Sequence, residues 1–233
     1  MVFEITMNLA IIKYNAGNIQ SVLTALERLG YNAEVTDDAE KIKAAHKVIF
    51  PGVGEAGSAM ESLRENNLDK VIKELKQPVL GICVGMQLLC AHSEESNTGC
   101  LGIVPVRVKK FPTPLSRPHP TFGHLLQKEK GSGNKSFLGE RQRVRFKIPQ
   151  VGWNTIFDLQ TDLFKDVEEN SYIYNVHSYY VEDSEYTIAK CNYELEYAAA
   201  IKKNNFYGVQ FHTEKSAATG DKIIKNFLEA PIP

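Results

Sequence analysis

The sequence has almost no net charge and no long apolar run. Its 233 residues include 27 Lys and Arg against 28 Asp and Glu, a formal net charge of −1, so no global charge favours nucleic acid or a membrane surface. No apolar stretch reaches the length of a membrane span, and the first residues lack the basic and apolar regions of a signal peptide. We therefore expect a cytoplasmic protein with no nucleic-acid or membrane partner.

Paired cysteines are also missing. The four cysteines contain no Cys-x-x-Cys pair, and no short cluster of Cys and His has the spacing of metal ligands: they are Cys83, Cys90, Cys100 and Cys191. Reduced thiols are the simplest expectation for such a chain. The sequence predicts neither a metal site nor a cofactor, and it shows no internal repeat of solenoid length.

Strands and helices alternate four times in the first part of the chain. Predicted strands occupy residues 8–14, 33–36, 47–50 and 78–83, and predicted helices follow at 19–29, 37–45, 56–76 and 86–91. Short connections in this order predict a mostly parallel sheet with helices on both faces, a flavodoxin-like single α/β domain. Functional sites in such folds form at the carboxyl ends of the strands.

The last third of the chain has a different pattern. Four further strands are predicted at residues 171–176, 186–191, 197–202 and 206–211, separated by polar turns. This spacing is typical of an antiparallel meander, a smaller β region added to the parallel sheet. A helix from Gly220 to about Leu228 closes the chain.

A basic segment rich in Pro and Gly separates the two regions. Residues 109–147 contain ten Lys and Arg against two acidic residues, so the segment carries about +8. Its first part predicts a long loop, and the alternation of basic and apolar residues over 141–148 predicts a strand. Such a strand serves either as a solvated sheet edge or as a docking surface for an acidic partner or anionic substrate. We expect one domain over residues 1–233, with this segment as an insertion.

Cys83 is the candidate nucleophile. It stands in Gly81-Ile82-Cys83-Val84-Gly85, where an apolar strand ends and a helical pattern begins. Gly-x-Cys-x-Gly at a strand-to-helix junction is typical of a nucleophile elbow, a turn so tight that flanking side chains would clash. The helix N-terminus beside the thiol favours thiolate. The alternative is a buried structural cysteine between two ordinary elements.

A cysteine nucleophile needs a base and a group that orients the base. Of the six histidines, only His212 ends a predicted strand with an acid, Glu214, two residues further on. Residues two apart in an extended segment point to the same side, so both side chains can enter one site. Taken alone, His-x-Glu is usually a coincidence at the surface, but beside a glycine-flanked cysteine it predicts a catalytic triad.

These motifs together resemble class I (triad) glutamine amidotransferases. The resemblance rests on residues 81–87, on Phe211-His212-Thr213-Glu214-Lys215-Ser216, and on Pro51-Gly52-Val53-Gly54, which is similar to the oxyanion strand of that family. Residues 14–22, 151–154 and 176–180 resemble the glutaminase subunits of imidazole glycerol phosphate synthases, of histidine biosynthesis. The similarity covers nearly the whole chain except residues 109–147. Thr213 stands where the family usually has Pro; because Pro there only stiffens the chain, we expect activity to survive.

The resemblance implies roles for individual residues. Cys83 attacks the carboxamide of glutamine, His212 transfers protons and Glu214 holds His212. Oxyanion and glutamine-binding roles fall on a larger set: Gly52, Val53, Gly54, Val84, Gln87, Ser178 and Tyr179. Gln87 could equally be a plain exposed helix residue.

The resemblance also implies a partner, a cyclase with a (β/α)₈ barrel that forms a heterodimer with this chain. Ammonia would pass to it through an internal channel, and the glutaminase would stay nearly idle until the partner engages. Candidate interface residues on the site's rim are Asn15, Asn18, Trp153 and Lys215. Three alternatives remain open: a related subunit feeding ammonia to another synthase, a stand-alone cysteine hydrolase acting on γ-glutamyl compounds, and a non-catalytic protein on the same scaffold.

Overall fold

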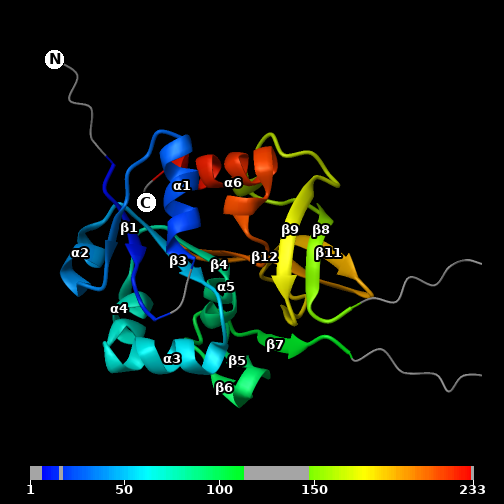
Figure 1. The fold of residues 1–233 in the computed structure, drawn as a ribbon, viewed down its shortest axis with the longest axis horizontal. Coiled ribbons are helices and arrows are strands. Elements are labelled where there is room, and N and C mark those ends of the chain that lie inside the picture. The colour runs from blue at the N-terminus through cyan, green and yellow to red at the C-terminus, as the bar shows by residue number, and fades with distance from the viewer. Residues whose placement is uncertain (1–6, 16–17, 113–146, 232–233) are drawn as a thin grey trace, which may run out of the picture.

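The computed structural model describes residues 7–15, 18–112 and 147–231 (Figure 1). Of the predicted insertion over 109–147, residues 113–146 lie outside the described residues, and with them nearly all of the strand expected over 141–148. Five parallel strands form one half of the sheet, in the order β2-β1-β3-β4-β13. Their bounds are Glu34–Thr36, Leu9–Ile12, Lys47–Gly52, Val79–Cys83 and Phe206–Val209.

Helices cover both faces of these strands, as expected for an α/β fold. In Figure 1, α1 (Ile19–Arg28) and α6 (Ala217–Glu229) lie on one side, and α3 (Ala56–Glu65) and α4 (Leu68–Glu74) on the other. The short helices are α2 (Ala39–Ala44) and α5 (Val84–Leu89). Strands β1, β3 and β4 are buried along their whole length, which explains their nearly continuous apolar sequences.

Lys47 is the exception in this apolar layer. It begins β3, is 1% exposed, and its Nζ donates to the carbonyl oxygens of Phe227 at 2.6 Å, Leu228 at 2.7 Å and Ala230 at 2.5 Å. These carbonyls belong to the end of α6, where backbone acceptors have no partner within the helix. A buried cation is therefore accommodated as the cap of the C-terminal helix.

An antiparallel half continues the sheet beyond β13. Strand β12 (Leu195–Lys203) pairs with β13 and with β11 (Thr187–Tyr193), which confirms three strands of the expected meander. The fourth, expected over 171–176, does not pair with β11 and lies beside a strand that the sequence did not predict. Strand β8 (Gln150–Phe157) joins β11 to β9 (Tyr172–His177). The rest of the sheet consists of short strands: β10 (Tyr179–Val181), β7 (Arg107–Lys110), β5 (His92–Ser93) and β6 (Thr98–Gly99).

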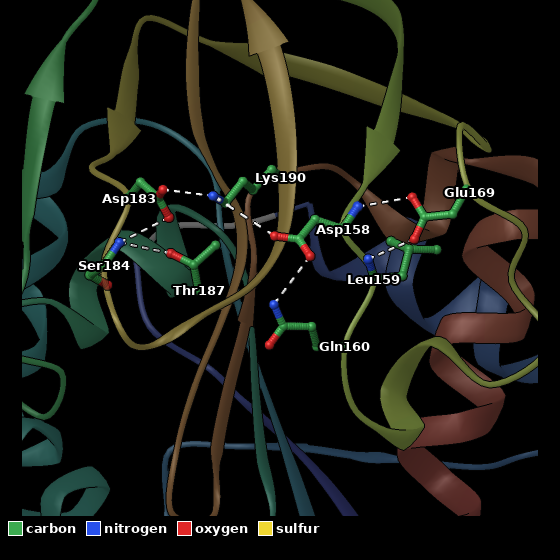
Figure 2. A network of polar contacts seen from close by, with 8 residues as sticks. All are labelled: Asp158, Leu159, Gln160, Glu169, Asp183, Ser184, Thr187 and Lys190. Carbon is green, nitrogen blue, oxygen red and sulfur yellow. Dashed lines mark hydrogen bonds and ion pairs between the residues drawn. The ribbon is translucent and has the colours of Figure 1, made fainter.

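Polar contacts hold the ends of these antiparallel strands together (Figure 2). Lys190 on β11 lies 2.8 Å from Asp183 and 3.8 Å from Asp158, which follows β8. Glu169 accepts the backbone N–H groups of Asp158 and Leu159, both at 2.9 Å. The network attaches the C-terminal end of β8, and the segment that precedes β9, to the rest of the sheet.

Three sequence expectations are wrong in detail. The expected loop from residue 109 begins later, because Lys109 and Lys110 belong to β7, which pairs with β10. The helix expected over 86–91 begins directly after Cys83 and ends at Leu89. The extended segment expected from His212 to Glu214 is instead a 3₁₀ turn, η3 (Thr213–Lys215). No helix in the described ranges is long and apolar enough to cross a membrane.

Candidate active site

Cys83 lies at the junction between β4 and α5, in a conformation that L-residues rarely adopt. Its φ is 54° and its ψ is −113°, and α5 starts with the next residue. The first turn of α5 packs directly on β3: a Cβ on Gly85 would lie 1.9 Å from the carbonyl oxygen of Phe50. Only glycine fits there, so the sequence forces the tight turn that projects the thiol. The strain at a positive φ is typical of functional sites.

His212 and Glu214 meet within a single turn. His212 Nδ1 lies 2.8 Å from Glu214 Oε1, and the two side chains are 5% and 2% exposed. The 3₁₀ turn brings the carboxylate back toward the ring, where an extended segment would carry it past. Burial alone would lower the pKa of His212, but contacts with Cys83 and Glu214 outweigh it and raise that pKa to about 10. The imidazolium is thus stabilised between two acidic partners.

Backbone hydrogen bonds fix the loop that carries His212. Its N–H donates to the carbonyl oxygen of Tyr174 on β9 at 2.9 Å. Ser216 Oγ donates to the His212 carbonyl at 2.6 Å and accepts the Tyr174 N–H at 3.0 Å. The histidine is therefore attached to β9 on one side as well as to β13 on the other.

The segment Pro51–Gly54 passes beside the elbow at the end of β3. Gly52 pairs with Cys83 across the two parallel strands, and a Cβ on Gly52 would lie 2.5 Å from the Gly85 nitrogen. Tyr14 donates its hydroxyl to the Pro51 carbonyl at 2.7 Å, and burial raises the pKa of that phenol. The close packing places the backbone of residues 52–54 next to the sulfur, where N–H groups can meet a developing oxyanion.

A cleft of about 250 Å³ opens above Cys83. The predicted residues that line it are Val53, Gly54, Cys83, Val84, Gln87, Ser178, Tyr179 and His212. Gln87 is 2% exposed rather than a surface residue, and its Nε2 donates to the Tyr179 carbonyl at 3.1 Å and to Gln210 Oε1 at 2.9 Å. The Ser178 carbonyl accepts from Phe111 N at 3.1 Å, so protein donors hold the backbone of Ser178 and Tyr179 in the cleft wall.

Three residues of this region are absent from the sequence-based prediction. Glu95 lines the cleft and accepts the Ala56 N–H at 2.8 Å; burial raises the pKa of its carboxyl. His177, also in the cleft wall, places Nδ1 2.8 Å from the Tyr179 carbonyl, and burial lowers its pKa to about 4, which keeps it neutral at pH 7.

The third missed residue is Gln210, fully buried two positions before His212, with its Nε2 3.9 Å from Cys83 Sγ. The sequence offered no periodic or spacing signal for Glu95. His177 lies within the stretch 176–180 that carried the resemblance, although no role was predicted for it. Gln210 could have been found from its place beside His212 at the end of a strand.

Of the four predicted rim residues, three are exposed: Asn15, Trp153 and Lys215. Asn18 is half-buried and caps α1 by accepting the Ser21 N–H at 3.4 Å, which gives it a structural role. No group of His, Cys, Asp and Glu in the described part of the chain has the geometry of a metal site.

Comparison with known families places this geometry in context. Residues 10–230 match the family Glutamine amidotransferase class-I. The chain belongs to the class I glutamine amidotransferases. The match includes the elbow, the His-x-Glu pair and the predicted oxyanion strand, so the resemblance found in the motifs extends over the whole domain.

Relatives within this amidotransferase family are close. An imidazole glycerol phosphate synthase subunit HisH from Bacteroides fragilis is 50% identical over 223 residues, which cover 96% of this chain and 100% of that protein. The HisH subunit of Escherichia coli is 40% identical, with the same coverage of 96% and 100%.

Solved structures of amidotransferases share the fold. A glutamine amidotransferase superposes with a TM-score of 0.64 at 14% identity, covering 95% of this chain and 97% of the other. The structure of PurLQS from Thermotoga maritima gives 0.61 at 14% identity, covering 96% and 98%. These similarities confirm the predicted α/β amidotransferase fold.

Proposed function

We propose that this amidotransferase is the glutaminase subunit of an imidazole glycerol phosphate synthase, in histidine biosynthesis. It hydrolyses glutamine to glutamate and supplies the ammonia to a cyclase subunit. The observation that carries the proposal is the buried His212–Glu214 pair beside Cys83 in an open cleft. Relatives at 40–50% identity over their whole length are HisH subunits, which selects this synthase among the partners that the family serves.

The proposed reaction begins at Cys83. Its thiolate attacks the side-chain carboxamide carbon of glutamine, and the oxygen becomes an oxyanion that N–H groups of Val53 and Val84 stabilise. The C–N bond then breaks, and His212 gives its proton to the departing ammonia. A thioester remains; His212 takes a proton from water, whose oxygen attacks the acyl carbon and releases glutamate and the thiolate. Glu214 keeps the imidazole oriented through both steps.

Charge in the cleft favours an amino acid as the substrate. The Glu95 carboxylate lines the same cleft as Cys83, and its pKa is raised because burial disfavours an unpaired anion. An α-ammonium group would supply the missing cation. Both protons of Gln87 Nε2 go to Tyr179 and Gln210, which fixes the orientation of the amide. Its oxygen is then available to accept a hydrogen bond from the α-ammonium group.

The cyclase would dock on the β8–β9 pair beside the cleft. The exposed large apolar side chains of the described residues gather there: Val151 at 60%, Trp153 at 54%, Tyr172 at 64% and Val176 at 37%. Val151 pairs with Val176, and the Trp153 and Tyr174 rings meet edge to face with centroids 5.7 Å apart. An exposed apolar patch of aromatic residues is typical of a protein interface. A (β/α)₈ barrel seated here would cover the cleft mouth and receive ammonia through an internal channel.

A glutaminase assay tests the proposal. We expect low activity from the chain alone and a strong increase with the cyclase and its nucleotide-derived substrate. Cys83→Ala should abolish activity, whereas Cys100→Ala, a half-buried thiol outside the cleft, should keep it. Steady activity that ignores the cyclase would favour a stand-alone hydrolase acting on γ-glutamyl compounds. Activity that survives Cys83→Ala would show that Cys83 is not the nucleophile. Absence of activity under all of these conditions would favour the non-catalytic alternative, and activation by a different synthase would identify a related subunit.

A further inference from the structure

Gln210 is the only fully buried amide side chain in contact with the candidate nucleophile among the described residues. It is 0% exposed, on the segment that leads from β13 to His212. Its Nε2 lies 3.9 Å from Cys83 Sγ, and its Oε1 accepts from Gln87 Nε2 at 2.9 Å. One amide group thus bridges the nucleophile and a residue of the cleft wall.

The orientation of the Gln210 amide follows from its neighbours. Gln87 Nε2 carries two protons, and the Tyr179 carbonyl accepts one of them at 3.1 Å. The other proton needs an acceptor, and the amide oxygen of Gln210, 2.9 Å away, provides it. The Gln210 nitrogen must then face the sulfur and donate to it.

The sulfur needs such a donor when it becomes a thiolate. The Val176 carbonyl, 3.9 Å from Sγ, can only accept a hydrogen bond, so it faces the thiol but repels the anion. Tyr14 is near the sulfur, but its hydroxyl proton goes to the Pro51 carbonyl. His212 is one donor, and Gln210 supplies another from a buried position where a hydrogen bond to an anion is strong.

We propose that Gln210 is a positioning residue of the glutaminase site, donating an N–H to the Cys83 thiolate while its oxygen fixes the Gln87 amide. The inference rests on the proposed function for the role of Gln87 toward glutamine. The contact between Gln210 and the sulfur does not depend on the proposed function. Gln210 sets the Gln87 oxygen toward the cleft and keeps the nucleophile reactive at the same time.

Alkylation of Cys83 tests the contact with sulfur without glutamine or a cyclase. The whole chain is treated with iodoacetamide at several pH values, and labelling of the Cys83 peptide is followed by mass spectrometry. We expect Gln210→Glu and Gln210→Met to slow labelling at pH 7.5 about tenfold, because each loses the N–H donor. The other ionisable groups facing the sulfur, His212 with Glu214 and Tyr14, are unchanged in both variants.

Glutamine kinetics with the cyclase test the second half of the inference. Gln210→Glu keeps an oxygen for Gln87 Nε2, so kcat should fall while KM stays within about twofold. Gln210→Met loses that acceptor too, and KM should also rise. Gln77→Glu is the matched control: it removes an amide donor to the Ile42 carbonyl at 2.8 Å, outside the cleft, and should label at the wild-type rate.

Labelling at the wild-type rate in both Gln210 variants, with circular dichroism showing a folded chain, would overturn the inference. If Gln210→Glu does not fold, the uncharged Gln210→Met decides alone. If the Gln210 variants label slowly but the wild type has no glutaminase activity with the cyclase, the Gln210–Cys83 contact is supported and the proposed function is contradicted.

Discussion

His212 and Glu214 are joined by one 3₁₀ turn and share a hydrogen bond of 2.8 Å with almost no exposure to solvent. The carboxylate has a single acceptor role in the described chain, since its second oxygen, Oε2, is buried without a hydrogen-bond partner. This geometry supports the proposed role of Glu214 in orienting the imidazole. Removal of the pair should affect catalysis more than folding.

Glu214→Gln should lower kcat about 10²- to 10⁴-fold in the presence of the cyclase, because the amide can hold the wrong imidazole tautomer. It should also lower the pKa of His212, which Glu214 helps to raise. Stopped assays across pH measure both effects. Glu185→Gln, at an exposed turn position, is the control and should behave like the wild type. Equal kcat in the two variants would contradict the orienting role.

The raised pKa of His212 predicts a stability difference that depends on pH. The folded-state pKa is about 10 against an ordinary 6.5, so the native chain holds a proton that the unfolded chain has lost between these values. This contribution is complete below pH 6.5 and is lost as pH rises through 10. Urea unfolding from pH 6 to 9.5 should show the wild type losing stability relative to His212→Asn. Parallel curves would argue against the shift.

Gly85→Ala should destabilise the chain at the upper end of about 1–3 kcal/mol, because the new Cβ overlaps the Phe50 carbonyl and neither backbone can move freely. Thermal unfolding measures the loss. Gly99→Ala is the matched control: nothing lies within 4 Å of its added Cβ, so its effect should stay within about 0.5 kcal/mol. Equal effects at the two positions would show that the close approach of α5 and β3 is dispensable.

Lys47→Met should cost about 2 kcal/mol or more, since three carbonyls at the end of α6 lose their donor while the side-chain volume is kept. Lys43→Met removes only a surface ion pair with Glu74 at 3.5 Å and should cost about 0–1 kcal/mol. Denaturant unfolding compares them. A similar small loss for both would mean that the buried ammonium does not stabilise the helix end.

Trp153→Ala should weaken binding of the cyclase by about 2 kcal/mol, roughly 30-fold, while leaving the free chain nearly as stable, because the ring is half exposed. Titration calorimetry measures the affinity. Tyr172→Ala lies at the other end of the same strand pair, away from the cleft, and should have a smaller effect. Unchanged affinity in both would place the interface elsewhere.

The parallel half of the sheet could be predicted because β1, β3 and β4 are buried along their whole length and each is followed by its own helix. Cys83 and His212 could be found for the same reason, since each ends a buried strand at the shared carboxyl edge. Short strands such as β5 and β6, two residues each, have no periodicity to detect. Glu95 lies in the 3₁₀ turn between β5 and β6 and reaches the cleft because that turn packs against the start of α3. No local sequence pattern predicts this placement.

Tyr174 connects the proposed cyclase interface to the candidate active site. Its ring packs against Trp153 on the face proposed for docking, while its N–H and carbonyl hold Ser216 and His212. A single residue therefore belongs to the proposed contact surface and also holds the backbone of His212, the proposed general base. If a docked subunit displaced the Trp153 ring, Tyr174 would move with it. The hydrogen bond between the Tyr174 carbonyl and the His212 N–H would then transmit that movement to the imidazole, so partner binding and proton transfer are coupled through one residue.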